Sequence, residues 1–324
     1  MDPLSDVLAL LKVQSVATAR LEGAGAWALR FPAYEHMKFG MVIEGDRWLW
    51  TDRTESRIRL APGDFFLLTD GVPYCFASAP DAPLRDSAEV LPASADEDGV
   101  MRFGEGTPRT VGVGGRFVFD DDASRPLLDS LPPLIHIRSG MPGIRALSLA
   151  WELIALETER QQPGAAAIAS GLANIVLVGM LRAHLRSGQP PAGWLGALAD
   201  ERIGQALRLM HGQIARRWKV DDLAAAVAMS RTSFAERFRV KVGMPPLEYL
   251  THWRMMLARR ALRTGTEPLS SIARRIGYES DTAFGLAFTK RHGVSPGRYR
   301  TAMRARLNAD GVPVRRQADR TALQ

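Results

Sequence analysis

Cysteine is almost absent from this chain. Cys75 is the single thiol among 324 residues, so no disulfide can form within the chain and no site with several cysteine ligands can exist. The chain must therefore fold on its apolar core, and 324 residues are enough for about two domains with sizeable cores.

The chain also lacks the short motifs that mark common enzyme classes. It contains no Gly-x-Ser-x-Gly, no P-loop and no His-Glu-x-x-His, and the run GVGG at 112–115 is too short for a dinucleotide-binding fingerprint. We therefore predict that the protein is not an enzyme and has no cofactor.

Leader and membrane signals are missing as well. The start, MDPLSDVLALLK, has acidic residues where a signal peptide has basic ones, and no apolar run approaches the roughly 20 residues of a membrane span. These features predict a cytoplasmic protein with no membrane partner.

Positive charge is concentrated at one end. Residues 200–324 hold 24 Lys and Arg against 11 Asp and Glu, a net charge of +13, whereas residues 1–199 have a net charge of −6. This division predicts one part that meets a polyanion and one that does not, although a solvated basic surface would have the same composition.

The front half has the pattern of a β domain followed by two helices. Short apolar runs with turn signals between residues 27 and 118 predict a sandwich or small barrel. Apolar residues at helical spacing then predict a helical hairpin over about 143–187. The second helix is apolar around most of its circumference, which fits either a subunit interface or burial in its own domain. The run SGQPPAG at 187–193 has the composition of a linker.

The back half contains an internal repeat. Phe234, Phe238, Gly243, Pro246 and Tyr249 recur 50 residues later as Phe284, Phe288, Gly293, Pro296 and Tyr299. Each copy predicts a helix-turn-helix, over about 220–242 and 269–292, in which glycine ends the second helix and proline begins the next. The long helix from Pro246 to about Gly265 would separate the two copies by nearly one turn of DNA.

Residues 218–300, from WKVDDLAAAVAMS to HGVSPGRYR, resemble the DNA-binding domain of the AraC/XylS transcription factor family. The front half, with GDFFLL, GGRFVFDD and LPPLIHI, resembles the cupin-type sensor domain of one branch of that family. The resemblance implies α+β architecture: a cupin-like β-barrel with a helical hairpin, and an all-α domain with two helix-turn-helix motifs. We predict a sensor and dimerisation domain over 1–190, a linker over 191–200, a DNA-binding domain over 201–303 and a disordered tail over 304–324.

Helical spacing assigns the residues that would meet DNA. The face opposite the repeated phenylalanines carries the candidates for reading bases, which are Arg231, Thr232, Glu236, Asp281, Thr282 and Leu286. Family members similar to this chain often have arginine or another polar residue where Glu236 and Leu286 stand, so the usual contact does not carry over there. The candidates for phosphate contacts are Ser230, Arg237, Arg239, Lys241, Ser280, Lys290, Arg291, Arg298 and Arg300.

The predicted sensor barrel lacks the imidazoles of a metal-binding cupin. Gly40 and Tyr74 stand where related domains can carry ligands, and His36 is the nearest histidine, so we predict no metal. We expect an unknown small-molecule effector in a pocket whose possible walls are Trp27, Trp48, Trp50, Phe66, Tyr74 and Phe76. Cys75, between two of these aromatics, is either a buried apolar residue or a thiol that senses oxidants.

Together these patterns predict a DNA-binding transcription regulator controlled by that effector. Its partners would be double-stranded DNA, a second copy of the chain and, for an activator, RNA polymerase. Two alternatives are a cupin-type enzyme that the basic half merely localises, and an architectural protein that binds DNA without sequence preference.

Overall fold

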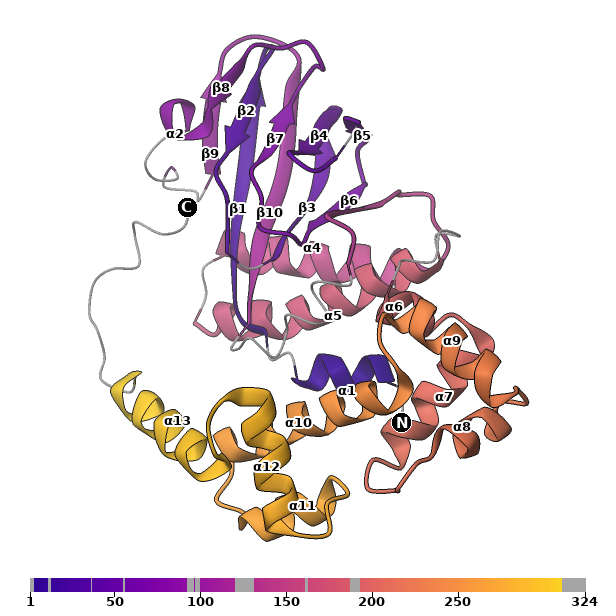
Figure 1. Cartoon of the computed structure of the whole chain (residues 1–324). Coiled ribbons are helices and arrows are strands. Elements are labelled where there is room, and N and C mark those ends of the chain that lie inside the picture. Colours follow the sequence, from indigo (N-terminus) through magenta and orange to yellow (C-terminus); the bar gives the residue numbers. More distant parts are fainter. Residues whose placement is uncertain are drawn as a thin grey trace. The chain divides into compact units, whose positions relative to one another are not determined.

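A computed structural model of the chain describes residues 3–10, 13–35, 37–54, 56–91, 96, 100–119, 131–160, 163–186 and 193–310. These residues divide into two compact units, one containing residues 13–186 and the other containing residues 3–10 and 193–310 (Figure 1). Each unit is described by itself below.

The first unit contains two β-sheets that pack face to face. One sheet has the strand order β11 (Leu134–Ile137), β6 (Phe65–Leu68), β3 (Met37–Glu44), β10 (Arg109–Phe119), β1 (Val13–Ala24) and β9 (Val100–Gly104). The other has the order β5 (Ile58–Leu60), β4 (Arg47–Thr51), β7 (Tyr74–Ala77), β2 (Ala28–Phe31) and β8 (Leu84–Asp86), which α2 (Ser87–Val90) follows. The sheets do not close into a barrel, so of the two arrangements predicted for this unit it adopts the sandwich.

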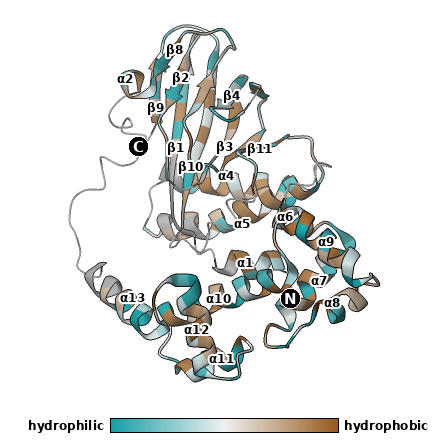
Figure 2. Ribbon diagram, in the orientation of Figure 1, coloured by the Kyte–Doolittle hydropathy of each residue, from teal (hydrophilic) through white to brown (hydrophobic). Residues whose placement is uncertain are grey.

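Most neighbouring strands pair antiparallel, whereas the edge strands β9 and β8 pair parallel with β1 and β2. β10 pairs with both β1 and β3, and β7 pairs with both β2 and β4. Figure 2 shows both hydrophobic and hydrophilic residues along the strands of the two sheets. Because successive side chains of a strand point to opposite faces, one set from each sheet lies between the sheets.

Two helices cover the outer face of the six-stranded sheet. They are α4 (Arg145–Arg160) and α5 (Ala165–Arg186). Trp151 of α4 packs edge-on against Phe39 of β3 and Phe65 of β6, at centroid distances of 5.3 and 6.1 Å. The buried side of α5 carries Ala173, Val176, Leu177, Met180 and Leu181. The predicted helical hairpin therefore completes the core of this unit.

The second unit is helical. It comprises α1 (Pro3–Leu10), α6 (Trp194–Ala197), α7 (Glu201–Gly212), α8 (Val220–Ala226), α9 (Arg231–Val242), α10 (Pro246–Thr264), α11 (Leu269–Arg275), α12 (Asp281–His292) and α13 (Pro296–Asp310). α8 with α9 and α11 with α12 form the two helix-turn-helix motifs that the repeat predicts, so the predicted α+β class with two domains is confirmed.

The boundaries of this unit differ from the predicted domains in three places. Helix α1 packs on α7, although residues 1–190 were expected to form the other domain. Helix α6 lies inside the predicted linker 191–200 and is buried, because Trp194 and Leu195 pack into the unit and the helix contacts α9. Helix α13 continues to Asp310, so the part of the predicted tail before residue 311 is helical, and 311–324 lie outside the described residues.

Candidate DNA-binding interface and sensor interior

The second helix of each helix-turn-helix has one buried and one exposed face. Phe234 and Phe238 of α9 are fully buried, and so are their counterparts Phe284 and Phe288 of α12. The ring centroids within each pair lie 5.6 and 5.8 Å apart. Because residues four apart share a helix face, these phenylalanines fix which side of each helix meets solvent.

Serine hydroxyls cap both helices at their N-termini. Ser230 Oγ accepts from the backbone N–H of Ser233 at 3.2 Å, and Ser280 Oγ accepts from that of Ala283 at 3.1 Å. Gly243 and Gly293 end the helices in the left-handed conformation, with φ of 89° and 73°. The repeat thus encodes equal start and stop signals for two recognition helices.

The residues predicted to read bases all lie on the exposed faces. This set comprises Arg231, Thr232 and Glu236 on α9, and Asp281, Thr282 and Leu286 on α12. Leu286 keeps 69% of its surface exposed. A large apolar side chain that faces solvent on a polar helix surface is available for a partner, such as the methyl group of thymine.

The predicted phosphate contacts fall into two groups. Arg239, Lys290 and Arg298 are exposed, Lys241 is half-buried, and the backbone N–H groups behind Ser230 and Ser280 lie at helix N-termini. Arg237, Arg291 and Arg300 instead make contacts within the protein, as follows.

Arg237 holds the first recognition helix against the start of α7. Its Nε and Nη2 donate to Asp200 Oδ2 at 3.1 and 2.8 Å, and Asp200 also caps α7. Burial raises the pKa of Asp200, but the hydrogen bond and charge of Arg237, together with backbone hydrogen bonds from Ile203 and Arg202, outweigh it and hold the pKa below its ordinary value. Because Arg237 pairs with Asp200, it has a structural role that helical spacing does not indicate.

Arg291 and Arg300 hold the second motif together in a similar way. Arg291 Nη2 donates to Nδ1 of His252 on α10. Arg300 Nη2 donates to the carbonyl of Glu267 at 2.6 Å. Both arginines are therefore engaged within the protein, which the sequence pattern alone did not show.

One continuous helix connects the two motifs. α10 has 19 residues, so at about 1.5 Å per residue it is roughly 29 Å long, close to the ~34 Å between successive major grooves on one face of DNA. Arg254 at its middle donates from Nε and Nη2 to the carbonyl of Ile214 at 3.0 and 2.8 Å. Nothing in the sequence pattern around Arg254 predicts that it fastens α10 to the segment before α8.

The repeated tyrosines pack back on the recognition helices, as the Gly-x-x-Pro-x-x-Tyr element predicts. Tyr249 lies 5.8 Å from Phe238, and Tyr299 lies 5.6 Å from Phe288, between ring centroids. In the first copy the hydroxyl of Tyr249 also accepts from Trp194 Nε1 at 2.6 Å and contacts His211 Nε2 at 2.8 Å. The motif therefore anchors each new helix to the unit before it.

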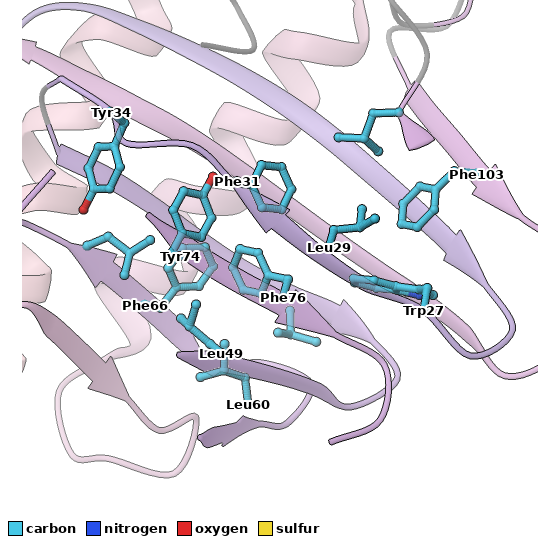
Figure 3. Close-up of a cluster of buried hydrophobic side chains, with 13 residues drawn as sticks. Trp27, Leu29, Phe31, Tyr34, Leu49, Leu60, Phe66, Tyr74, Phe76 and Phe103 are labelled. Carbon is cyan, nitrogen blue, oxygen red and sulfur yellow. The ribbon is translucent and has the colours of Figure 1, made fainter. Parts of the chain in front are cut away.

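Aromatic side chains pack together between the two sheets of the other unit (Figure 3). Phe31 stacks on Tyr74 at 4.8 Å, Phe66 packs edge-on to Phe76 at 5.1 Å, and Trp27 packs edge-on to Phe103 at 5.1 Å. Four predicted pocket walls thus line this interior, and they are Trp27, Phe66, Tyr74 and Phe76.

The other two predicted walls lie elsewhere. Trp48 and Trp50 do share one face of β4, but it is the half-exposed outer face, while Arg47, Leu49 and Thr51 point between the sheets. Because side chains alternate along a strand, the spacing of the tryptophans predicts that they share a face. The spacing does not predict which face of the strand points to the interior.

Two family models match the chain. Residues 2–186 match the model described as Cupin, and residues 223–302 match the model described as Helix-turn-helix domain. A putative AraC-like transcription regulator from Streptomyces antibioticus is 40% identical over 301 residues, which cover 93% of this chain and 98% of that protein. Another from Streptomyces lividans is 42% identical over 303 residues, with the same coverage.

The chain belongs to the AraC-like family of transcription regulators. It is therefore a DNA-binding regulator of transcription, as predicted, and its relatives are regulators and not enzymes. Among solved structures, the chain is similar to the DNA-binding domain of AdpA, a global transcriptional factor, crystallised with a target DNA. The identity is 33%, the match covers 33% of this chain and 96% of that one, and the TM-score is 0.32.

Cys75 of this AraC-like regulator is a buried thiol. It has no exposed surface, and burial raises its pKa in spite of the neighbouring Arg30. A raised pKa lowers the fraction of reactive thiolate, which favours the apolar role over the redox role.

Metal ligands do not gather in the described part of this AraC-like regulator. No group of three His, Cys, Asp or Glu residues there could hold an ion, and His36 lies outside the described residues. The absence of a metal remains a prediction.

The hydropathy of one helix differs from the expectation of no membrane-length run. Residues Ala167–Arg186 of α5 are long and apolar enough to cross a bilayer, a property shared by core helices of soluble proteins. The buried side of α5 packs on α4, β1 and β11, which accounts for much of its apolar character.

Proposed function

We propose that this AraC-like regulator is a one-component switch in which a small molecule, bound between the sheets of the cupin-type domain, controls how its helix-turn-helix motifs engage DNA. The observation that supports this most is the pairing, in one chain, of two exposed recognition helices on a shared rod with a separate sandwich whose interior is lined by aromatics. Such an interior suits a small ligand with an apolar body.

The recognition helices α9 and α12 would enter two successive major grooves. In this arrangement Arg231, Thr232, Glu236, Asp281, Thr282 and Leu286 face base edges. Arg239, Lys241, Lys290, Arg298 and the helix N-termini at Ser230 and Ser280 face phosphates. Glu236 suits the amino group of cytosine.

Binding of the full-length protein to promoter fragments tests this arrangement. We expect mobility shifts at low ionic strength and a footprint with defined edges over two adjacent major grooves. A footprint without defined edges would support architectural binding instead, and the absence of any shift would refute the proposal. Genome-wide mapping of bound sites would identify the controlled genes and, through them, the class of effector.

The helical hairpin carries an apolar surface that suits a second copy of the chain. Leu149, Leu153 and Leu156 follow one face of α4, and each keeps about half of its surface exposed. Ile168 and Ile175 of α5 are exposed to a similar degree. A row of large exposed apolar residues on two adjacent helices is typical of an interface.

A groove adjoins this surface. It has a volume of about 460 Å³, and among the residues that line it are Leu147, Ile175, Val178, Gly179, Arg182 and Arg186. A partner helix that packs along α4 and α5 would cover it. Light scattering is expected to give a dimer for the wild type and a monomer for Leu153→Lys, and a monomeric wild type would refute dimerisation.

The remaining parts of the proposal concern the cell. The regulator would act in the cytoplasm, and if it is an activator it would recruit RNA polymerase to the promoter. Transcription in vitro with purified polymerase, with and without the regulator, measures the sign of regulation directly.

A further inference from the structure

An arginine is buried between the two sheets of the cupin-type domain without a carboxylate partner. Arg47 at the start of β4 is 4% exposed. Its Nη2 donates to the carbonyl of Leu21 at 2.9 Å, and its guanidinium lies over the ring of Trp27 at 5.5 Å from the centroid. Among the described residues, no carboxylate pairs with it.

A second donor without an acceptor lies beside it. Trp27 is 6% exposed, and its indole Nε1 is buried, as is Nε of Arg47. Within the part of the chain that the structure describes, neither N–H has a hydrogen-bond partner. Two buried donors at one place, one of them charged, are a polar arrangement that lacks an acceptor.

The opposite sheet is shaped to admit these two side chains. A Cβ atom on Gly112 of β10 would lie 2.5 Å from Arg47 Nη1, and one on Gly23 of β1 would lie 2.5 Å from Trp27 Nε1. These glycines belong to the adjacent strands β1 and β10 of the six-stranded sheet. Side chains are thus missing from that sheet at the two points where the guanidinium and the indole approach it.

Burial of an unpaired charge is costly. A guanidinium that leaves water loses hydration, and one carbonyl and an aromatic ring replace only part of it. Burial lowers the pKa of Arg47 to about 10, which reflects this cost. An apolar residue of similar length would fill the same space without it, so packing alone does not explain an arginine here.

We propose that Arg47 and Trp27 form the polar end of the effector site, and that they bind the carboxylate of a small organic acid whose apolar body packs among the aromatic side chains between the sheets. This inference rests on the proposed function, because it names the chemical class of the effector for the same interior.

The chemistry of the site favours a carboxylate over a neutral ligand. A carboxylate supplies two acceptor oxygens and one negative charge, which matches a guanidinium N–H, an indole N–H and one positive charge. Phe103, which packs edge-on to Trp27, and Leu29 belong to the same buried cluster and would face the rest of the ligand (Figure 3). A buried water would accept hydrogen bonds but would leave the charge uncompensated.

Calorimetry and melting curves of the full-length protein test this site. The probes are benzoate, phenylacetate and octanoate, each compared with its neutral amide, and sulfate serves as a simple anion. We expect at least one carboxylate to bind and raise the melting temperature, and its amide and sulfate to bind about tenfold more weakly or not at all.

Two substitutions remove one donor each. Arg47→Met removes the charge and should weaken binding of that carboxylate about tenfold or more, and Trp27→Phe keeps a ring but removes the N–H and should weaken it by roughly threefold to tenfold. Arg47→Met should melt no lower than the wild type, because it relieves the buried charge. If Arg47→Met fails to fold, the affinity of Trp27→Phe still decides the matter.

The matched controls lie on the outer face of the same sheet. Arg59 of β5 pairs with Asp46, and Trp48 of β4 is half-exposed, so Arg59→Met and Trp48→Phe should bind the acid as the wild type does. Failure of all three acids to bind at millimolar concentration would overturn the proposal. So would equal binding of acids and amides, or wild-type affinity in both interior variants.

A separate measurement distinguishes this inference from the proposed function. DNA binding by the wild type and by Arg47→Met is measured without any acid. If the wild type binds DNA but calorimetry detects no binding of the carboxylic acids, only this inference is refuted. If the wild type binds no DNA, the proposed function is refuted whether or not the acids bind.

Discussion

Asp6 and His211 form a hydrogen bond across 205 residues of chain, with Asp6 Oδ2 lying 3.2 Å from His211 Nδ1. The other ring nitrogen, Nε2, lies 2.8 Å from the hydroxyl of Tyr249, which accepts from Trp194 Nε1. His211 also stacks on Trp253 at 4.2 Å. A consistent set of donors runs from Trp194 to Tyr249, from Tyr249 to His211 and from His211 to Asp6, so the N-terminal helix completes the core of the helical unit.

We therefore expect Asp6→Ala to destabilise the helical unit by about 1–3 kcal/mol, because it removes the carboxylate that accepts from a buried imidazole. Chemical denaturation followed by circular dichroism measures this loss. Arg208→Ala, an exposed change on the same helix as His211, is the control and should change stability by less than about 0.5 kcal/mol. Equal stabilities for the two variants would show that α1 is not part of the core.

The turns of the two helix-turn-helix motifs have different residues at the position that takes the left-handed conformation. Ala228 has a φ of 52°, and it occupies the place that Gly277, with a φ of 86°, takes in the second copy. A left-handed conformation strains every residue with a Cβ, so Ala228→Gly should stabilise the protein by about 0.5–1 kcal/mol.

The reverse change in the other copy is the comparison. A Cβ on Gly277 would lie 2.7 Å from both the carbonyl of Ala215 and Nη2 of Arg254, so Gly277→Ala should destabilise by roughly 2 kcal/mol or more. Urea titrations of both variants check the opposite signs. A destabilised Ala228→Gly would mean that Ala228 contributes packing that outweighs its strain.

Arg237 and Arg239 lie on the same recognition helix, but replacing each by alanine should have a different effect. Arg237→Ala removes the partner of Asp200, whose side chain is 6% exposed, and should cost about 1 kcal/mol of stability. Arg239→Ala should leave stability nearly unchanged and weaken binding to every DNA sequence. Melting curves and DNA titrations on both proteins separate the two roles, and a stable Arg237→Ala would refute the structural role.

Substitutions at the proposed base contacts and at the proposed phosphate contacts should change DNA affinity differently. Arg231→Ala should change sequence preference, whereas Lys290→Ala should weaken all duplexes alike and reduce the slope of log affinity against log salt by about one unit. Titrations of cognate and scrambled duplexes at several salt concentrations measure both effects. Equal losses on the two duplexes for Arg231→Ala would remove it from the base-reading set.

Two imidazoles predict how acid affects the helical unit. Burial and the nearby Arg291 and Arg259 lower the pKa of His252 to about 4, and the same causes lower that of His292 to about 4. The unfolded chain takes up these protons near pH 6.5, so stability is present above that pH and is lost as pH falls toward 4. We expect a loss on the order of 1 kcal/mol per imidazole over this range.

Melting curves between pH 7 and pH 4 measure that loss. His252→Asn replaces a titrating acceptor with a neutral one, so its melting temperature should depend less on pH than that of the wild type. Substitution of the surface residue Thr251 should leave the pH dependence unchanged. If the melting temperature of His252→Asn falls with pH as steeply as that of the wild type, His252 is excluded as the source of the acid sensitivity.

The helical unit was largely predictable from the sequence because its signals are local and written twice. Phe234 and Phe284, Ser230 and Ser280, and Gly243 and Gly293 carry the helix face, start and stop within a dozen residues each. The sandwich was less predictable because strand pairing is not local. Turn signals located most strands, but neither the open edges of the sheets nor the inward direction of Arg47 follows from alternation alone, since alternation has two opposite phases.

The contacts that Arg237 and Arg291 make within the protein were unpredictable for the same reason. Arg237 and Arg291 are exposed by helical spacing, yet their partners Asp200 and His252 lie 37 and 39 residues away. The contact of α1 with His211 was unpredictable as well, because it depends on tertiary packing and not on the pattern of residues 3–10.

The unbroken backbone of α10 limits which operators the protein can recognise. α10 runs without a break from Pro246 to Thr264, so in the proposed arrangement a rotation of one recognition helix would be passed along α10 to the other. Insertion of about half a helical turn, roughly five base pairs, between the two contacted segments would carry one of them to the far side of the duplex. Under the proposed binding in two successive grooves, the regulator would measure angular phase along its target as well as the identity of the bases.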